Sequence, residues 1–275
     1  MKFHLAPLEG VSDCAFRTLC YNYGADVTYT EMIRVDGIIR RNKATMALLD
    51  LKNDVPTIIQ LLVVKPSSAR KFVAMFSTLF TASGIKPVGV NLNLGCPSPD
   101  VICEGGGAAL VKRTSRVQEL VTILKQIGVP VTLKIRLGLN QLEKDKMVYL
   151  NLVNGVDADG FIVHARHARQ ESHEPADWLV FEELVKTGKK IIANGDICTA
   201  ADVAFFNQIG IQEVMIGRAA VRNPVVFSVL KGGCGETLDV EKGKYLQLCS
   251  KYPSHPKYQK NVLAYLGKGA QMRGG

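Results

Sequence analysis

The stretch 90-VNLNLGCPSPDVICEGGGAALV-111 determines how the rest of this chain is interpreted. It begins as an apolar, β-branched run and leads to Asn93 and Cys96, with the cysteine between a glycine and a proline. Three glycines, residues 105–107, follow within ten residues. A free thiol at the end of a buried strand, beside a glycine loop open to a ligand, indicates a chemical role. The alternative is a small buried hydrophobe, which most cysteines are.

Short apolar runs of this kind recur along the chain, each followed by a helical pattern. The predicted strands are residues 4–6, 27–30, 57–62, 88–93, 131–135, 160–164, 190–193 and 213–216. Predicted helices between them include residues 13–23, 67–81, 116–127 and 200–208. Such alternation predicts a parallel sheet, and eight units fit an α/β (β/α)8 TIM barrel. The structural alternative is a doubly wound open sheet. Such a sheet usually has a glycine-rich motif after its first strand, whereas this chain has APLEG there, which favours the barrel.

The C-terminal ends of the strands are where a (β/α)8 barrel carries its active groups. The first predicted strand is followed by Pro7 and Leu8, and the other seven carry residues that could bind a ligand at or near their ends. These residues are Glu31 and Arg34, Gln60, Asn93 with Cys96, Lys134 with Arg136, His164 with Arg166, Asn194 to Asp196, and Gly217 with Arg218. Residues two apart on a strand share a face, so Lys134/Arg136 and His164/Arg166 form pairs. The strand ends therefore predict a ligand site.

The last two strand ends favour phosphate binding. Gly195 and Gly217 would let backbone N–H groups approach an anion, and Arg218 adds a forked positive charge, although tight turns also explain both glycines. Burial of the Lys134 charge at the end of a strand costs free energy unless the ammonium contacts an anion or a polarisable ligand such as a flavin ring. Gln60 could hydrogen-bond the same ring. A solvent-exposed lysine is the alternative.

Cys96 could act as a nucleophile beside a base, or donate a proton to carbon as a general acid. The second role suits reductive chemistry over a flavin. His164, His167 and His173 lie close together in the chain, but their spacing matches no metal signature, so no metal site is predicted.

Composition limits the partners and the compartment. Lysine and arginine outnumber aspartate and glutamate by 34 to 25, which favours a polyanionic partner. Residues 231–275 hold eight of these cations against three acidic residues, interleaved with tyrosines 245, 252, 258 and 265. This mixture suits RNA, and a solvated basic tail is the alternative. The seven cysteines are scattered, which predicts free thiols and no disulfide framework. The chain has no apolar run long enough for a membrane span and no signal-like start. We therefore predict a cytoplasmic protein without a membrane partner.

The organisation changes near residue 232. Residues 233–242 are glycine-rich and charged, and residues 243–270 have the pattern of one or two short helices. We therefore predict a catalytic barrel over residues 1–232, followed by a short, basic, mainly helical C-terminal element over residues 233–275.

Together these motifs resemble the tRNA-dihydrouridine synthase family. The matching blocks are LAPLEGVSD, TEMIRVDG, QLL, NLNLGCPSPDVICEGGGAAL, VTLKIRLG, IVHAR, IIANGDI and VMIGRAAVRNP, over residues 3–225. The resemblance implies FMN at the barrel mouth, NADPH as electron donor and tRNA as partner. It also implies hydride transfer to carbon 6 of a uridine while Cys96 protonates carbon 5. No obligate protein partner is evident.

The same resemblance assigns the other site residues. The implied flavin-binding residues are Pro7, Leu8, Gln60, Lys134, His164, Asn194, Gly195, Asp196, Gly217 and Arg218. Asn93, Arg136 and Arg166 fall where the family handles the uracil ring and nearby phosphates.

The chain also departs from the family pattern. Leu8 stands where methionine is usual, Val63 replaces a glycine, and Ala165 and His167 replace a glycine and a threonine. The family normally appends a longer helical RNA-binding domain than residues 233–275 can form. Positive charge on this element and on arginines 34, 40 and 41 is expected to hold the tRNA.

Other functions stay open. One is a small-molecule flavin dehydrogenase of the same fold, of the dihydroorotate or dihydropyrimidine type, against which the basic tail argues. Another is a non-catalytic RNA-binding protein, against which the set Cys96, Lys134 and His164 argues. A phosphate-sugar barrel enzyme without a flavin is more distant.

Overall fold

The computed structural model describes residues 1–49, 51–53, 55–81, 84–171 and 173–268. Its centre is one parallel sheet in the order β1-β8-β7-β6-β5-β4-β3-β2. The strands are β1 (Lys2–Leu5), β2 (Thr28–Arg34), β3 (Thr57–Leu62), β4 (Gly89–Leu94), β5 (Val131–Arg136), β6 (Gly160–His164), β7 (Ile191–Asn194) and β8 (Glu213–Ile216). A parallel bridge between His4 and Val27 joins β1 to the start of β2 and closes the ring. The predicted (β/α)8 barrel is confirmed.

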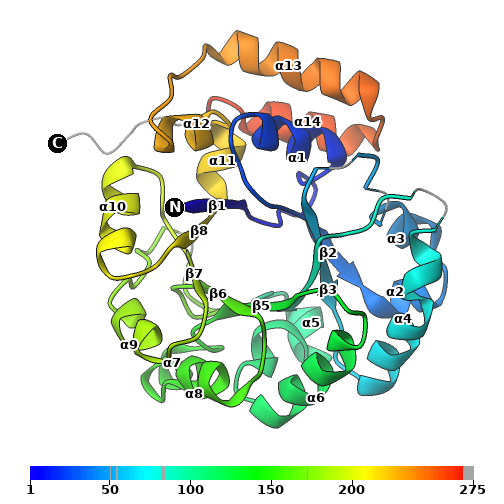
Figure 1. Ribbon diagram of the computed structural model, residues 1–275, viewed down its shortest axis with the longest axis vertical. Helices are drawn as coiled ribbons and strands as arrows, with labels where there is room; N and C mark the ends of the chain where they lie inside the picture. The colour runs from blue at the N-terminus through cyan, green and yellow to red at the C-terminus, as the bar shows by residue number, and fades with distance from the viewer. Residues whose placement is uncertain (50, 54, 82–83, 172, 269–275) are drawn as a thin grey trace.

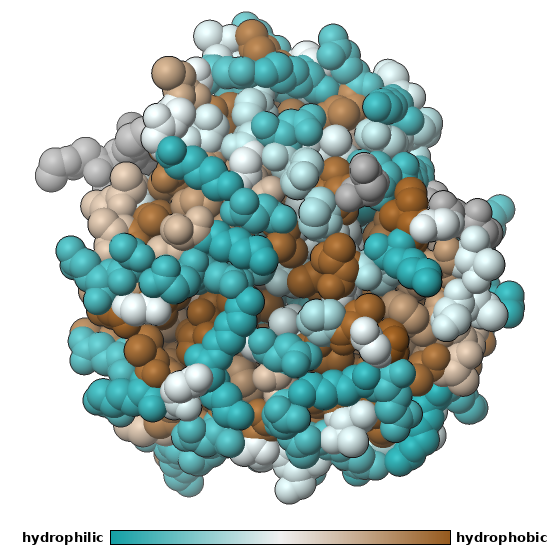
Figure 2. All heavy atoms as spheres, viewed as in Figure 1, coloured by the Kyte–Doolittle hydropathy of each residue, from teal (hydrophilic) through white to brown (hydrophobic). Residues whose placement is uncertain are grey.

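Helices surround this ring (Figure 1). They are α1 (Cys14–Asn22), α2 (Val35–Ile39), α3 (Lys43–Ala47), α4 (Pro66–Leu79), α5 (Pro99–Cys103), the 3-10 helix η1 (Gly107–Leu110), α6 (Thr114–Lys125), α7 (Gln141–Asp145), α8 (Val148–Gly155), α9 (Val180–Lys186), α10 (Ala200–Gln208), α11 (Arg218–Arg222), α12 (Val226–Leu230), α13 (Leu238–Lys251) and α14 (Pro256–Tyr265). None of these described helices combines the length and the apolar character needed to cross a membrane. On the face seen in Figure 2, hydrophilic residues predominate and apolar residues show between them.

All eight predicted strands are present, and β2 differs most from its prediction. It continues to Arg34, four residues beyond the predicted end, with an irregular register against β3 between Tyr29 and Met32. A bulge of this kind re-aims the side chains that follow it. The polar residues Glu31 and Arg34, which marked a strand end in the sequence, therefore lie within the strand.

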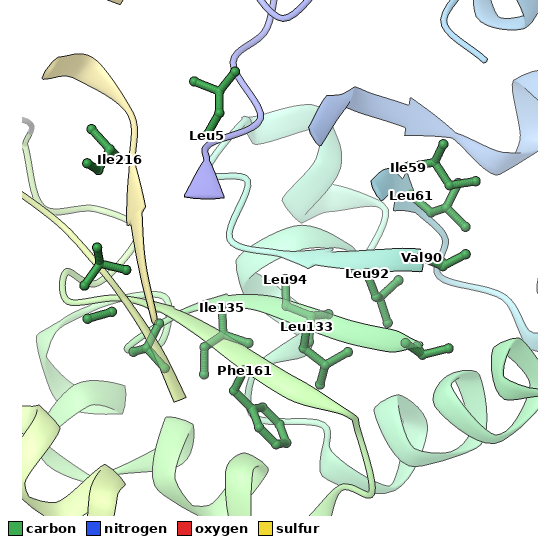
Figure 3. Close-up of a cluster of buried hydrophobic side chains, with 14 of the residues drawn as sticks. Leu5, Ile59, Leu61, Val90, Leu92, Leu94, Leu133, Ile135, Phe161 and Ile216 are labelled. Carbon is green, nitrogen blue, oxygen red and sulfur yellow. The ribbon is translucent and has the colours of Figure 1, made fainter. Parts of the chain in front are cut away.

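Alternation along the strands separates the core from the site. Val90, Leu92 and Leu94 of β4 belong to the buried apolar cluster between sheet and helices, together with Leu133 and Ile135 of β5 (Figure 3). Because successive side chains point to opposite faces, the residues between them point into the barrel. The polar positions of β4 and β5 are thus gathered inside the ring.

Helices α13 and α14 pack beside α1 on one side of the barrel (Figure 1). The first of them begins at Leu238, five residues before the predicted start at 243. The boundary at residue 232 stays a prediction, and residues 269–275 of the predicted element lie outside the described residues.

The tyrosines of this element differ from the sequence-based expectation that they stack on RNA. Tyr245 is fully buried and meets the Phe16 ring edge-on, with a centroid distance of 6.4 Å. Tyr258 is also buried, whereas Tyr265 is 49% exposed. Burial therefore removes Tyr245, which packs against α1, and Tyr258, whose hydroxyl bonds Glu31, from any surface that RNA could reach, and the expectation is wrong for these two residues.

Candidate active site

A pocket of about 140 Å³ lies at the C-terminal ends of the strands. Its lining residues are Pro7, Glu9, Met32, Gln60, Asn93, Gly95, Cys96, Lys134, Arg136 and His164. Seven of these ten were predicted as site residues, and they come from β1 or its following turn and from β3, β4, β5 and β6. The structure thus brings together residues that are far apart in the chain.

A chain of hydrogen-bonded side chains includes the pocket residues Gln60 and Asn93. Thr132 Oγ1 accepts a hydrogen bond from Asn91 Nδ2 (2.9 Å), and Asn91 Oδ1 accepts one from Gln60 Nε2 (2.8 Å). Gln60 Oε1 in turn accepts from Asn93 Nδ2 at 2.8 Å. Each amide has one donor and one acceptor engaged, so the orientation of Gln60 is fixed by its neighbours.

The same chain ends on the turn that carries the cysteine. Asn93 Oδ1 accepts from the backbone N–H groups of Gly95 (3.1 Å) and Cys96 (2.9 Å). Asn93 therefore orients the Cys96 turn, and its predicted contact with the uracil ring stays a prediction. The Cys96 side chain is half-buried and faces the pocket.

The glycine run supports this turn from the other side. The Cys96 carbonyl accepts a hydrogen bond from Ala108 N–H at 3.1 Å. Gly107 has a left-handed φ of +53°, and a Cβ atom there would lie 2.5 Å from the Cys96 carbonyl oxygen. Close backbone approach, rather than access for a ligand, is the physical reason for this glycine.

Replacement of Gly107 by alanine should destabilise the protein more than replacement of Gly105. Both glycines have a positive φ, which costs an alanine about 1–2 kcal/mol, but the space around Gly105 is open. The overlap with the Cys96 carbonyl should lower the free energy of unfolding of Gly107→Ala by a further amount of about 1–3 kcal/mol. Urea unfolding of both variants measures the difference, and equal losses would contradict the close approach.

Electrostatics inside the pocket are dominated by cations. Burial and the neighbouring Arg136 lower the pKa of Lys134 to about 7. Within the described residues, the Lys134 ammonium has no hydrogen-bond or ion-pair partner. Such a group favours a ligand that is anionic or electron-rich.

His164 is neutral near pH 7 for a related reason. Burial, followed by the charges of Lys134 and Arg136, holds its pKa well below the usual value of 6.5. His164 Nε2 lies 3.2 Å from Arg166 Nη1. Because a guanidinium can only donate, Nε2 accepts and the ring proton is assigned to Nδ1.

A second group of predicted residues lies after β6, β7 and β8, linked to the pocket through His164. Arg166 is buried, and its guanidinium binds the Asp196 carboxylate and the Glu174 carbonyl (Nε, 2.8 Å). Arg218 Nη2 lies 2.5 Å from the other Asp196 oxygen. Asp196 thus joins two arginines, and the predicted contact of Arg166 with substrate stays a prediction.

Packing explains part of this second group. Gly195 has a φ of +125°, and a Cβ atom there would lie 3.0 Å from Ala176 Cβ. Asn194 Nδ2 donates to the Met215 carbonyl at 2.8 Å, and Leu8 packs against the apolar cluster inside the barrel. Their predicted roles in cofactor binding stay predictions.

Three lining residues escaped the sequence-based prediction, namely Glu9, Met32 and Gly95. Glu9 and Gly95 adjoin predicted residues, so a wider window around each strand end would have included them. Met32 was missed because β2 was ended too early.

A larger groove of about 550 Å³ lies at the start of α6, away from the strand ends. Its lining residues are Lys112, Arg113, Thr114, Ser115, Arg116 and Glu119. No group of three or more His, Cys, Asp or Glu side chains able to hold a metal ion occurs among the residues that the structure describes.

Comparison with known families places the chain. Residues 4–266 match the family model described as dihydrouridine synthase (Dus). This chain belongs to the dihydrouridine synthase family. The predicted family and enzyme class are thereby confirmed.

Relatives within the dihydrouridine synthase family differ in length. A probable tRNA-dihydrouridine synthase of Aquifex aeolicus is 31% identical over 245 residues, which cover 87% of this chain and 74% of that protein. The human protein named tRNA-dihydrouridine(47) synthase NAD(P)(+)-like is 31% identical over 237 residues, or 84% of this chain and 35% of its own length. The chain thus spans about a third of the human relative.

Solved structures share the barrel of this synthase family member. Morphinone reductase aligns with a TM-score of 0.59 at 12% identity, covering 99% of this chain and 94% of its own. A 2-naphthoyl-CoA reductase complex aligns with a TM-score of 0.62 at 11% identity, covering 84% and 50%. These similarities support the fold.

Proposed function

We propose that this protein is an FMN-dependent tRNA-dihydrouridine synthase that reduces a tRNA uridine to 5,6-dihydrouridine, with NADPH as electron donor. The observation that carries the proposal is the convergence of Cys96, Lys134 and His164 on one pocket of a dihydrouridine synthase barrel. The name of the human relative contains NAD(P)(+), which supports a nicotinamide as donor.

The residues of the pocket fit an FMN ring. Lys134 lacks an acceptor among the described residues, and an electron-rich ring would provide one. Pro7, Gln60, Lys134 and His164 would hold the ring, while Gly195, Gly217 and Arg218, at the ends of β7 and β8, would bind its phosphate. Bound and reduced FMN would supply the hydride that carbon 6 of the uridine receives.

Cys96 would complete the reduction as the acid. Its S–H bond breaks and a C–H bond forms at carbon 5, so that one hydride and one proton saturate the C5–C6 double bond. The remaining thiolate takes a proton from solvent. A Cβ atom added at Gly95 would lie 3.5 Å from Arg136 Cγ, so the Arg136 side chain lies beside the Cys96 turn. Its positive charge would therefore lie near this thiolate.

The uridine must leave its stack to reach the pocket, because the reaction occurs at the base within the barrel mouth. The chain has 34 basic and 25 acidic residues, and this excess of positive charge favours a polyanionic partner. Lys112, Arg113 and Arg116 line the groove at the start of α6 and add positive charge there. Arg34, expected to hold tRNA, forms an ion pair with Glu104 at 2.9 Å.

All seven cysteines are free thiols, which supports a cytoplasmic location.

An absorbance experiment tests the proposal. The purified or FMN-reconstituted protein should show flavin bands at about 370 and 450 nm that bleach with NADPH. Faster recovery of the bands with unmodified tRNA than with orotate or uracil would support the synthase. Recovery with the small pyrimidines alone would favour a small-molecule dehydrogenase, and a protein that cannot bind FMN would overturn the proposal.

A further inference from the structure

The turn after β1 carries Pro7 and Glu9 to the pocket wall. It is compact, because Leu8 N–H donates to Ser12 Oγ (2.8 Å) and Ser12 N–H donates to the Leu8 carbonyl (2.9 Å). These local bonds determine the shape of the turn. Its position relative to the barrel depends on contacts from elsewhere in the chain.

Glu31 of β2 provides the first of these contacts. Its side chain is buried, and one carboxylate oxygen accepts a hydrogen bond from the Gly10 backbone N–H. The other oxygen accepts one from the Tyr258 hydroxyl of α14, 227 residues away. Burial and Glu31 both raise the pKa of Tyr258, so its hydroxyl keeps the proton that it donates.

Helix α14 contacts the turn at a second point. Asn261 Nδ2 donates to the Gly10 carbonyl at 3.0 Å. Tyr258 and Asn261 are three residues apart, so they share one face of α14. A Cβ atom at Gly10 would lie 2.8 Å from Asn261 Nδ2, which shows how closely the helix approaches. Both backbone polar groups of Gly10 are therefore held, by Glu31 on one side and α14 on the other.

A third contact lies just before α14. Ser254 Oγ donates to Asp13 Oδ2 at 2.6 Å. Asp13 Oδ1 accepts from Phe16 N–H at 2.9 Å and thereby caps α1. The C-terminal element thus contacts the turn and the helix that follows it.

We infer that Glu31, Tyr258 and Asn261 are positioning residues that hold residues 7–9 against the pocket, so that α14 forms part of the catalytic unit. The inference rests on the proposed function for its effect on turnover. A buried carboxylate needs its donors, and loss of the Tyr258 hydroxyl removes the donor to one Glu31 oxygen. The turn is then held less firmly, and the pocket wall moves.

Tyr258→Phe removes one hydroxyl and tests this directly, with Tyr21→Phe, an exposed tyrosine of α1, as the matched control. Amide hydrogen exchange in a peptide covering residues 6–12 should become about tenfold faster in Tyr258→Phe, as expected for one lost bond to a charged group. Exchange in β5 and in Tyr21→Phe should stay unchanged. Unchanged exchange at residues 6–12 would overturn the inference.

Kinetics separates positioning from direct tRNA contact. Tyr258→Phe should lower kcat about tenfold and leave KM for tRNA within about twofold, since a misplaced wall affects the reacting geometry. A raised KM with unchanged kcat would mean that the residue acts in tRNA binding, and would overturn a positioning role.

Glu31→Gln should keep most of the uridine-reduction activity that Glu31→Leu loses. A glutamine oxygen can accept from Gly10 N–H while its amide donates to the Tyr258 oxygen, whereas leucine can do neither. Equal activity of both variants would contradict the hydrogen-bonded clamp. If the wild-type protein reduces no uridine, the proposed function fails, and the exchange measurement still decides the inference.

Discussion

Cys96→Ala should lower the rate of uridine reduction by about 10²–10⁴-fold, the usual contribution of a positioned proton donor. Asn93 and Ala108 hold the backbone of this residue, and neither contact involves the thiol. The alanine variant should therefore fold, and it should bind FMN with unchanged affinity. Single-turnover recovery of the flavin absorbance with tRNA measures the reaction, and flavin fluorescence titration measures binding.

Cys103→Ala is the matched control, because Cys103 is an exposed thiol on α5 and does not line the pocket. It should reduce uridine at the wild-type rate. A Cys96→Ala variant with wild-type turnover would remove the cysteine from the mechanism. A loss of FMN affinity equal to the loss of rate would instead make Cys96 a binding residue.

Lys134→Met should weaken FMN binding by about 10–100-fold at pH 7, which corresponds to one or two charge-assisted contacts. Methionine keeps a similar length and removes the charge. Lys186→Met on α9 is the control, since Lys186 is exposed, pairs with Glu183 and does not line the pocket. Equal affinity of wild type and Lys134→Met would contradict a role of the ammonium in holding the ring.

The pH dependence of binding follows from the same lysine. With a pKa of about 7, the Lys134 ammonium predominates at pH 6 and is largely lost by pH 8. An electron-rich ligand favours the ammonium, so binding takes up a proton and wild-type affinity should fall between about pH 7 and 9. The FMN phosphate is already largely dianionic there, since the second pKa of a phosphate monoester is about 6. Lys134→Met should bind with a flat profile, and a wild-type slope in this variant would assign the titration to another group.

The C-terminal element has a buried face that includes Tyr245 and Tyr258. Helix α14 of this element contacts the turn after β1 through Tyr258 and Asn261. The basic residues of this element are among those that we expect to hold tRNA under the proposed function. Removal of α14 should therefore affect both binding and catalysis.

Much of the fold and of the pocket followed from the sequence alone. Alternation in β4 separates Val90, Leu92 and Leu94 from Asn91 and Asn93, and a period of two leaves no other arrangement in a buried strand. Because parallel strands of a barrel end at one rim, the polar residues after each strand had to meet. Cys96, Lys134 and His164 could therefore be placed together from their positions in the chain.

Tertiary structure alone decided which of these side chains are engaged with one another. The bulge in β2, the pairing of Arg166 with Asp196, and the contact between Glu31 and Tyr258 all join segments distant in the chain. Hydrogen bonds of this kind depend on the position of a few atoms, and no local periodicity specifies them. Gly107 shows the same limit, since its role depends on how closely the Cys96 carbonyl approaches in space.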